Sequence, residues 1–377
     1  MSLFLDRRRF LRFATTAAGV AGAAGVAGVA PAFAQDPPAS KKIAWHDVRD
    51  WGVEGKGWAD TEKYYDRLPA RAKGRVRDAV WSLSRHSAGM LTRFQTDADE
   101  IFVDYQVTSD RLDMPHMPAT GVSGVDLYAD DAEGDWKWLS VSRPAAQTIN
   151  TSLISGIAPG ERGYTLYLPL YNGTEYLRVG VPEGAKFAPI EPRQEKPIVF
   201  YGTSITHGAC ASRPGMPHPA ILGRRLNRPV INLGFSGNGK MEAEVGEFLC
   251  ELDPAVYVID CLPNMNGEEV AERAEPLVRQ LRAARPETPI LLVEDRTYTN
   301  APFLPDRQQR HESSRAALRA AYNAVVDAGM KKIAYLNGET LLGDDRDDTT
   351  DGSHPSDLGF YRHAEAMEPV LEKLLQA

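Results

Sequence analysis

The chain has 377 residues and a formal net charge of −8, so it is long enough for two domains with separate hydrophobic cores. Its acidic balance and the lack of a basic cluster interleaved with aromatic residues argue against nucleic acid as a partner. Three cysteines are too few for a disulfide scaffold, and their odd number leaves at least one unpaired within a monomer.

The first 34 residues have the features of a segment that is removed after export. Consecutive arginines at positions 7–9 precede a weakly apolar Ala/Gly/Val stretch at 14–30, and P-A-F-A follows as a small-residue cleavage sequence. This order resembles a twin-arginine signal, and the stretch is too weakly hydrophobic for a membrane anchor. We expect residues 1–34 to be a signal peptide, although a flexible basic tail is the alternative. The mature protein is then periplasmic or secreted, without stable membrane insertion.

Residues 35–192 are predicted to form an all-β sandwich. Short alternating or aromatic-rich runs are separated by Gly, Pro, Asn and Asp, which is typical of such domains. The runs lie at 100–107, 124–129, 136–142, 164–170 and 175–181. All six tryptophans fall in this region, either as core residues or as a platform for sugar rings. The proline-restricted loop 114–121 has no obvious strand face for its polar side chains, and we expect it to reach the functional site.

A change of pattern near residue 192 indicates a second domain over 193–377. Residues 182–197 are rich in proline and charge, show neither helical nor strand period, and are predicted to be a linker. Strand patterns then alternate with helical patterns. Predicted strands are 197–201, 230–234, 255–261, 289–294 and 332–336, and predicted helices are 219–226, 241–249, 268–284, 312–328 and 357–375. This alternation predicts an α/β fold with a flavodoxin-like five-stranded parallel sheet and helices on both faces.

Polar groups follow several of these strands where the strands end. Ser204 follows the first strand, a glycine-rich turn containing Gly237 follows the second, and Asn264 follows the third. Asp351 and His354 lie after the last strand, just before the final helix. Because the carboxyl ends of parallel strands meet at one edge, these groups are expected to converge. A hydroxyl nucleophile, a base, an acid that orients the base and neutral donors are the parts of an acyl-transfer site.

These blocks, in this chain order, resemble the SGNH (GDSL-like) hydrolase family, with G-T-S-I-T where many members have G-D-S-x-S. The string G-V-D-L-Y at 124–128 is similar to the G-x-D-L-Y of a β-sandwich domain that precedes the hydrolase domain in one subgroup. The resemblance implies that Ser204 is the nucleophile, His354 the general base and Asp351 the group that orients it. It also implies an oxyanion hole made by the backbone N–H groups of Ser204 and Gly237 and the side-chain amide of Asn264. Thr203 and the Pro-Asn-Met sequence at 263–265 depart from the usual pattern without removing a catalytic atom.

Taken alone, each of these residues could be an ordinary helix cap or turn residue. The catalytic interpretation depends on the expected convergence of all five at one edge of the sheet. Four further residues are candidates for substrate contact: His116, His207, Arg213 and Arg296. For His207, as for His218, packing behind the site is the alternative. For Arg296, the alternative is a structural ion pair with the acidic residues that precede it.

The sequence contains no H-E-x-x-H motif and no clustered Cys/His spacing, so we expect no required metal and no cofactor. Small and polar residues, T-H-G-A-C-A-S-R-P-G, follow Ser204 where a lipase would need apolar walls. We therefore expect an exported serine esterase that hydrolyses short acyl esters, in particular acetyl esters on carbohydrate. The expected partner is a small-molecule or glycan acyl ester. The alternatives are a lipase or thioesterase of the same fold, or a glycan-binding protein whose hydrolase domain is inactive. Neither the oligomeric state nor any pairing of Cys210, Cys250 and Cys261 follows from the sequence.

Overall fold

The computed structural model describes residues 41–131 and 134–376. The predicted signal peptide lies outside these residues. Within them, none of the helices combines the length and the apolar character that crossing a bilayer requires. All three cysteines are free thiols.

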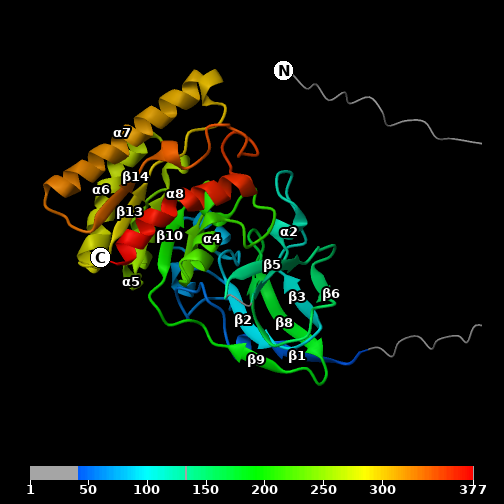
Figure 1. Ribbon diagram of the computed structural model, residues 1–377. Coiled ribbons are helices and arrows are strands. Elements are labelled where there is room, and N and C mark those ends of the chain that lie inside the picture. Colours follow the sequence, from blue (N-terminus) through cyan, green and yellow to red (C-terminus); the bar gives the residue numbers. More distant parts are fainter. Residues whose placement is uncertain (1–40, 132–133, 377) are drawn as a thin grey trace, which may run out of the picture. The chain divides into compact units, whose positions relative to one another are not determined.

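Two antiparallel sheets form a β-sandwich in the first half of the described chain (Figure 1). The strand orders are β1-β8-β3-β6 and β5-β4-β7-β2-β9. Their alternate side chains, such as Val103 and Tyr105 on β3 and Tyr164 and Leu166 on β7, fill one core. The predicted sandwich is thereby confirmed. The strands are β1 (Ile43–Asp47), β2 (Leu91–Thr96), β3 (Glu100–Val107), β4 (Asp126–Asp130), β5 (Trp136–Val141), β6 (Thr148–Ser155), β7 (Arg162–Tyr167), β8 (Thr174–Pro182) and β9 (Phe187–Ile190).

The segment predicted to be an unstructured linker contains strand β9, and that part of the prediction is wrong. β9 pairs only with β2, at the edge of its sheet. An edge strand tolerates Pro189 because one side of its backbone makes no ladder hydrogen bonds. The high proline and charge content therefore hid an edge strand.

A five-stranded parallel sheet forms the second half, in the order β11-β10-β12-β13-β14. This is the flavodoxin-like order, as predicted. All residues of β10 and β12 are buried, as expected for parallel strands that are covered on both faces. The strands are β10 (Ile198–Gly202), β11 (Val230–Gly234), β12 (Val256–Asp260), β13 (Ile290–Val293) and β14 (Ile333–Leu336).

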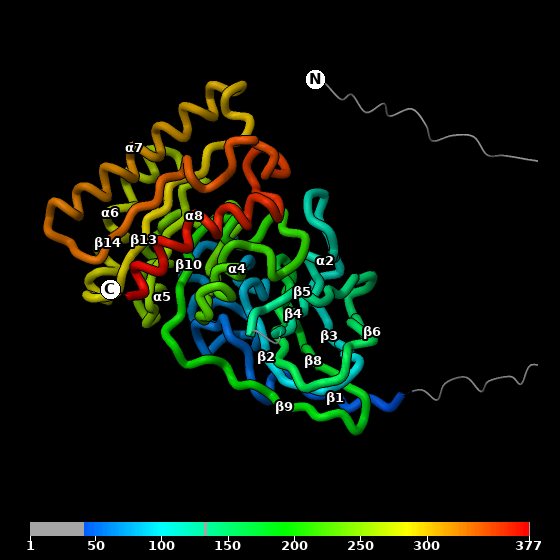
Figure 2. The backbone as a smooth tube through the Cα atoms, in the orientation of Figure 1, coloured from blue at the N-terminus to red at the C-terminus, as the bar shows by residue number. Residues whose placement is uncertain are grey.

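Helices cover both faces of this sheet (Figure 2). One apolar cluster joins α5, α6 and α7 to one face, and a second joins α4 and α8 to the other. The bounds are α3 (Ser204–His207), α4 (His218–Arg225), α5 (Ala243–Glu251), α6 (Gly267–Ala284), α7 (Pro305–Asp327) and α8 (Asp357–Leu375), with the short helices α1 (Asp78–Ser84) and α2 (Ala119–Val122) in the first half. Helix α7 begins seven residues before its predicted start at Glu312.

Part of the first half belongs to the core of the parallel sheet and not to the sandwich. Trp58, Leu68 and Val80 pack in the same apolar cluster as Phe248 on α5. The indole N–H of Trp58 also donates to Glu251 at 2.7 Å. The tryptophans are therefore not all sandwich residues.

Candidate active site

Ser204 stands where β10 turns into the short helix α3. β10 ends at Gly202, where a Cβ atom would lie 2.1 Å from the Thr206 hydroxyl, so only glycine fits there. Thr203 caps α3, because its hydroxyl accepts a 3.3 Å hydrogen bond from the backbone N–H of Ile205. The threonine that replaces the family's usual aspartate thus serves as a helix cap. Ser204 becomes the first residue of the helix, and 7% of its surface is exposed.

Three side chains form a continuous hydrogen-bonded relay at this edge of the sheet. Ser204 Oγ lies 2.9 Å from His354 Nε2, and His354 Nδ1 lies 2.8 Å from Asp351 Oδ2. The other carboxylate oxygen accepts the backbone N–H groups of Ser353 and His354 at 2.9 and 2.8 Å. Burial raises the pKa of Asp351, but these backbone and side-chain hydrogen bonds outweigh it and lower the pKa to about 2. Asp351 is therefore ionised at neutral pH and fixes the orientation of the imidazole.

Arg296 braces the loop that carries the histidine. Its Nε donates to the Ser353 carbonyl at 2.6 Å, and its Nη2 donates to the Ser353 hydroxyl at 2.7 Å. Its Nη1 pairs with Asp295 at 2.7 Å. Only 1% of Arg296 is exposed, so direct contact with substrate, one of its two sequence interpretations, is wrong. The ion-pair interpretation agrees with the structure.

The glycine-rich turn after β11 lies against the end of β10. Phe235 N–H donates to the Gly202 carbonyl at 3.0 Å, which brings the turn next to Ser204. Within the turn, Gly237 has φ +69°, a left-handed conformation that favours glycine. The Asn264 amide nitrogen reaches the same turn, 3.4 Å from the Phe235 carbonyl and 3.3 Å from the Gly239 carbonyl. Both contacts are long, so the amide is only weakly engaged by its neighbours.

His207 is fully buried, so the prediction that it contacts substrate is wrong and its packing interpretation holds. Its Nε2 lies 2.7 Å from the Leu170 carbonyl, and its ring stacks on Tyr171 with 4.1 Å between the centroids. The Tyr171 hydroxyl in turn donates to the backbone carbonyl of Ser204 at 3.3 Å. Tyr171 supports the nucleophile from the sandwich half of the chain, and no sequence motif pointed to it.

His116 comes from the sandwich half and is exposed beside the relay. Its ring centroid lies 6.4 Å from that of His354. Two backbone hydrogen bonds between Met114 and Met117, 3.0 and 2.9 Å long, close the turn that presents it. The proline-restricted loop therefore lies next to the base.

Arg213 is held by the G-x-D-L-Y string. Its Nη1 donates to the buried carboxylate of Asp126 at 3.0 Å and also to the Tyr128 hydroxyl. Asp126 further accepts the backbone N–H of Gly215 at 2.8 Å and the indole N–H of Trp138 at 2.9 Å. The structure thus places Arg213 in a clamp between the two halves of the chain, whereas the sequence indicated substrate contact.

The loop that carries Arg213 also holds the start of α8. The Ser212 backbone N–H donates to Asp357 at 2.9 Å, and its hydroxyl donates to the same carboxylate at 2.5 Å. Asp357 is the first residue of α8, three residues after His354. Thr120 of the sandwich half donates to the Ser212 carbonyl at 2.6 Å. Loop 208–217 therefore connects the sandwich to the segment that carries the base.

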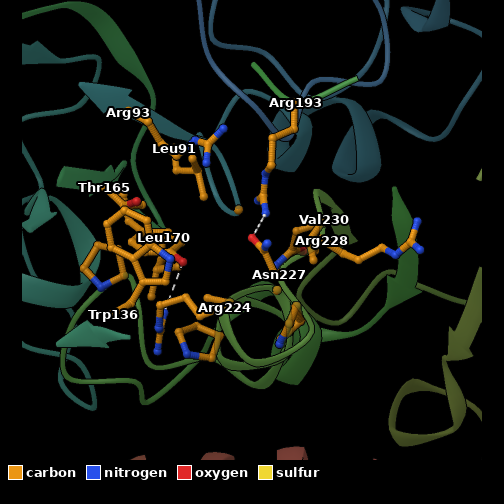
Figure 3. Close-up of a pocket in the computed structure, with 18 residues that line it drawn as sticks. Leu91, Arg93, Trp136, Thr165, Leu170, Arg193, Arg224, Asn227, Arg228 and Val230 are labelled. Carbon is orange, nitrogen blue, oxygen red and sulfur yellow. Dashed lines mark hydrogen bonds between the residues drawn. The ribbon is translucent and has the colours of Figure 1, made fainter. Parts of the chain in front are cut away.

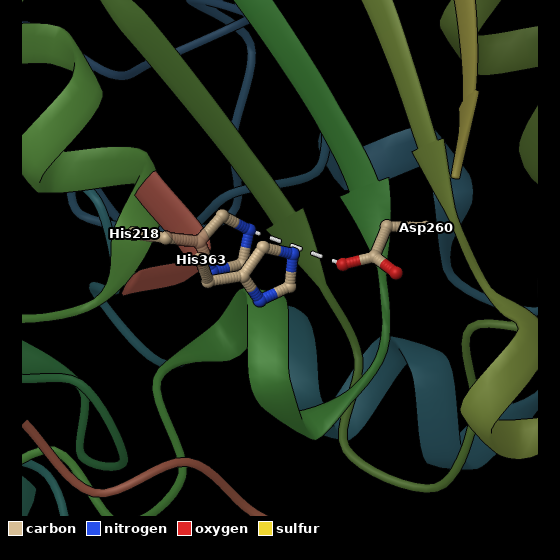
Figure 4. Close-up of side chains that lie close together, drawn as sticks. All are labelled: His218, Asp260 and His363. Atoms are coloured by element: carbon tan, nitrogen blue, oxygen red, sulfur yellow. Dashed lines mark ion pairs between the residues drawn. The ribbon is translucent and has the colours of Figure 1, made fainter. Parts of the chain in front are cut away.

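His218 lies behind the site in a buried cluster with Asp260 and His363 (Figure 4). The two imidazole rings stack with 4.1 Å between centroids and 8° between planes, and His218 Nε2 is 3.9 Å from Asp260. Because the rings are nearly parallel, their in-plane lone pairs do not converge on one point, as a shared ion would require. Asp260 instead accepts the Thr206 hydroxyl at 3.2 Å, and burial raises its pKa to about 7. The packing interpretation of His218 agrees with this arrangement.

Comparison with known proteins finds a matching family model for each half of the chain. A model of the GDSL-like lipase/acylhydrolase family matches residues 195–372, and a model of the GxDLY N-terminus of SGNH-hydrolase-type esterases matches residues 43–187. No curated protein sequence matches the chain.

Several solved structures have the same fold. A protein described as a GDSL-like lipase from Bacteroides ovatus is 31% identical, with a TM-score of 0.85, over 89% of this chain and 98% of that one. A salicylyl-acyltransferase from a tetracycline biosynthetic pathway is 18% identical, with a TM-score of 0.69, over 88% and 97% of the two chains. A family two carbohydrate esterase from Cellvibrio japonicus is 13% identical, with a TM-score of 0.59, over 89% and 99%. The similarity therefore spans the sandwich and the parallel sheet together.

Proposed function

Because the chain belongs to the GDSL-like lipase/acylhydrolase family, we propose that it is an exported serine esterase that removes short acyl groups, in particular acetyl groups, from carbohydrate. The observation that carries the proposal is the relay of Ser204, His354 and Asp351, whose links are 2.9 and 2.8 Å long. A hydroxyl, an imidazole and an ionised carboxylate in this order are the machinery of covalent acyl transfer.

In the first half of the reaction, Ser204 Oγ attacks the ester carbonyl carbon while His354 Nε2 takes the hydroxyl proton. The positive charge that forms on the imidazole is stabilised by Asp351. The negative charge on the carbonyl oxygen is stabilised by the backbone N–H groups of Ser204 and Gly237 and by the amide of Asn264. When the C–O bond breaks, His354 gives its proton to the leaving alcohol, and an acyl-serine remains.

In the second half, water replaces the alcohol. His354 removes a proton from the water as its oxygen attacks the acyl-serine, and the same donors stabilise the second oxyanion. Collapse returns the proton to Ser204 Oγ and releases the carboxylic acid. These steps use the three triad side chains, the Asn264 amide, the backbone N–H groups of Ser204 and Gly237, and water.

Three observations support a short acyl group and a sugar alcohol. The residues that follow Ser204 in the sequence, T-H-G-A-C-A-S-R-P-G at 206–215, are small or polar. The exposed His116 lies beside the base, with 6.4 Å between its ring centroid and that of His354, where it can contact a bound sugar. The fold is shared with a protein described as a family two carbohydrate esterase.

Hydrolysis of 4-nitrophenyl esters and of acetylated xylan tests this proposal. Each buried methylene gains about 0.8 kcal/mol, so an open apolar pocket would favour octanoate, whereas a pocket closed after acetyl penalises it. We expect a higher kcat/KM for acetate than for octanoate, and release of acetate from the polysaccharide. A preference for octanoate would indicate the lipase alternative, and no turnover of any ester would indicate the inactive glycan-binding alternative.

Export is proposed from the arginine-rich start of the chain. Lysine substitution of both Arg7 and Arg8 should leave the precursor in the cytoplasm, because the twin-arginine route reads the arginine pair. Sequencing of the N-terminus of the protein recovered outside the cytoplasm should show removal of residues 1–34. An intact N-terminus on exported protein would contradict the signal-peptide interpretation.

A further inference from the structure

A groove between the sandwich and helices α4 and α8 is lined by several positively charged side chains, although the protein as a whole is acidic. Its volume is about 920 Å³, within the range of ligand sites. Five cationic side chains line it, and among its described lining residues Asp135 alone is acidic. The five are Arg93, Lys137, Arg213, Arg224 and Arg225. Since the whole chain has a formal charge of −8, this cationic groove has the opposite sign to the protein's net charge.

Among the described residues, four of the five cations have carboxylate partners, whereas Arg224 has none. Arg93, Lys137, Arg213 and Arg225 each form an ion pair with an acidic residue. Arg224 lies 4.1 Å from the centre of the Tyr128 ring. It also donates to the Tyr167 hydroxyl at 3.2 Å, the hydrogen bond drawn from Arg224 in Figure 3. Among residues 41–131 and 134–376, no carboxylate lies within ion-pair distance of its guanidinium. Arg224 is thus held in place, and within the described part of the chain its charge has no directly paired carboxylate, although Asp126 lies near enough to interact with it electrostatically.

Aromatic side chains complete the lining of the cationic groove. Trp136 lines both the groove and the adjoining pocket (Figure 3), and Tyr361 is 47% exposed in the groove. Flat aromatic faces beside a few polar donors are typical of sites that bind ring-shaped polar ligands. The adjoining pocket, which shares Arg93, Trp136 and Arg224 with the groove, has only about 30 Å³, enough for about two water molecules. A ring-shaped ligand must therefore lie in the groove itself.

We propose that the cationic groove is a binding site for an acidic polysaccharide, with a sugar carboxylate paired to Arg224 and a sugar ring against Trp136. A planar guanidinium binds a carboxylate through two parallel hydrogen bonds, which gives both affinity and orientation. None of the triad residues lines the groove, so binding does not depend on the ester chemistry. The site would hold an anionic glycan on the enzyme while its esters are presented to Ser204.

Isothermal titration of the mature full-length Ser204→Ala protein tests the proposal. The probes are a fully de-esterified oligogalacturonate and a neutral xylo-oligosaccharide of equal length, at low and high salt. We expect saturable binding of the acidic probe only, weakened at high salt because the contact is ionic. Because the acidic probe carries no ester, its failure to bind would leave the proposed esterase activity untouched. That activity is tested separately with 4-nitrophenyl acetate.

Two variants and a control locate the site. Arg224→Gln should weaken binding about tenfold or more, as expected for loss of a charge-assisted hydrogen bond. Arg225→Gln, at a side chain that is paired with Glu368 and 23% exposed, should weaken it less, and it also serves if Arg224→Gln does not fold. Arg279→Gln removes an exposed, paired arginine on α6 and should have no effect. The proposal would be overturned if the neutral probe bound as tightly as the acidic probe, or if the acidic probe did not bind saturably. It would also be overturned if Arg279→Gln weakened binding as much as Arg224→Gln.

Discussion

Two buried or half-buried carboxyl groups at the same sheet edge have opposite pKa shifts, and the difference separates their roles. Asp351 accepts three hydrogen bonds from Ser353 and His354, and its pKa is about 2. Asp260 is fully buried with a hydroxyl donor, and burial raises its pKa to about 7. Only Asp351 keeps its full negative charge through the neutral range, so it is the group that can stabilise an imidazolium.

The triad is tested by single substitutions. Ser204→Ala and His354→Ala should each lower kcat about 10⁴-fold or more, because the residues act as one unit. Asp351→Asn should cost about 10⁴-fold, since an amide favours the wrong imidazole tautomer. The rate is measured with 4-nitrophenyl acetate and the fold by circular dichroism. Near-normal turnover by folded Ser204→Ala would contradict the assignment.

Substitution of the expected oxyanion donor Asn264 should lower kcat less than substitution of a triad residue. Asn264→Ala should lower kcat about 10² to 10³-fold, as for loss of one donor to the developing charge. A rise in KM with unchanged kcat would instead place the amide in ground-state binding.

The raised pKa of Asp260 predicts a specific pH dependence of stability. Between its ordinary pKa of 3.8 and about 7, the folded protein holds this proton and the unfolded chain does not. The free energy of unfolding should therefore gain a contribution as pH falls from 8 toward 5. Asp260→Asn should remove this contribution. The measurement is the denaturant midpoint of both proteins at pH 8 and pH 5, and the wild type should show the more favourable change on going to pH 5. Identical pH dependence in both proteins would show that Asp260 is ionised in the fold.

At the scale of elements, loop 208–217 joins three parts of the molecule. It follows the nucleophile's helix, receives Asp126 from β4 and holds Asp357 at the start of α8. The G-x-D-L-Y string therefore has a physical role in this chain. It supplies the buried carboxylate and the Tyr128 ring that fix Arg213 and Gly215.

Breaking this clamp should reduce both stability and turnover. Arg213→Gln leaves the buried Asp126 carboxylate without its cation, which typically costs about 3 to 5 kcal/mol. The double variant with Asp126→Asn should recover part of that loss. We expect kcat for 4-nitrophenyl acetate to fall with Arg213→Gln, because the loop supports the segment that carries His354. Arg279→Gln is the matched control, and equal effects of the two variants would contradict a specific role for the clamp.

The elements that the sequence predicted well are those with a strong local pattern. Strands β10, β12 and β13 are mainly apolar runs whose residues are all buried, because both faces of the sheet are covered there. The predicted bounds of the five parallel strands differ from the structure by no more than one residue at each end. Strand β9 was missed because its proline and charges suit an edge position. The packing of Trp58 and Val80 against α5 was missed because it joins residues far apart in the chain, which no local pattern encodes.

For the site residues, too, the sequence predicted what short motifs encode and did not predict contacts between distant residues. Ser204, Asp351 and His354 lie in short motifs, and the structure brings them together as the sequence indicated. For the side chains that support them, the sequence left two interpretations open, because the role of a lone arginine or histidine depends on its partners. Arg296 and His207 turned out to be buried.

At the scale of the whole molecule, burial lowers the pKa of six histidines in the described part of the chain, His46 among them. Burial lowers the pKa of His86 and His363 to about 3 and that of His311 to about 4, and it holds those of His207 and His218 well below the ordinary value of 6.5. In an unfolded chain these imidazoles take up protons near pH 6.5. Acid therefore favours the unfolded state, and the stability that is present above pH 6.5 is lost as pH falls below it. This loss opposes the smaller gain from Asp260.

The activity of the enzyme should consequently fall in acid for two separable reasons. Protonation of the base stops catalysis reversibly in folded protein, whereas protonation of the buried histidines unfolds it. Turnover and circular dichroism measured on the same samples from pH 8 to pH 4 distinguish the two. We expect activity to fall first, with recovery on return to pH 8, and ellipticity to fall at lower pH.

His363→Phe tests the second cause directly. Neither ring nitrogen of His363 has a hydrogen-bond partner among the residues that the structure describes, and its ring stacks on His218. A phenyl ring can therefore take its place without breaking any of the described hydrogen bonds. At pH 8 the variant should be at least as stable as the wild type, because a buried unsatisfied polar group has been removed. Below pH 6.5 its free energy of unfolding should fall less steeply with pH than that of the wild type. The slope should decrease by the equivalent of up to one proton taken up on unfolding. Exposed His116, replaced by Phe, is the control and should leave the slope unchanged. An unaltered slope in His363→Phe would mean that this histidine is not held neutral by burial, and that the acid limit of the fold has another origin.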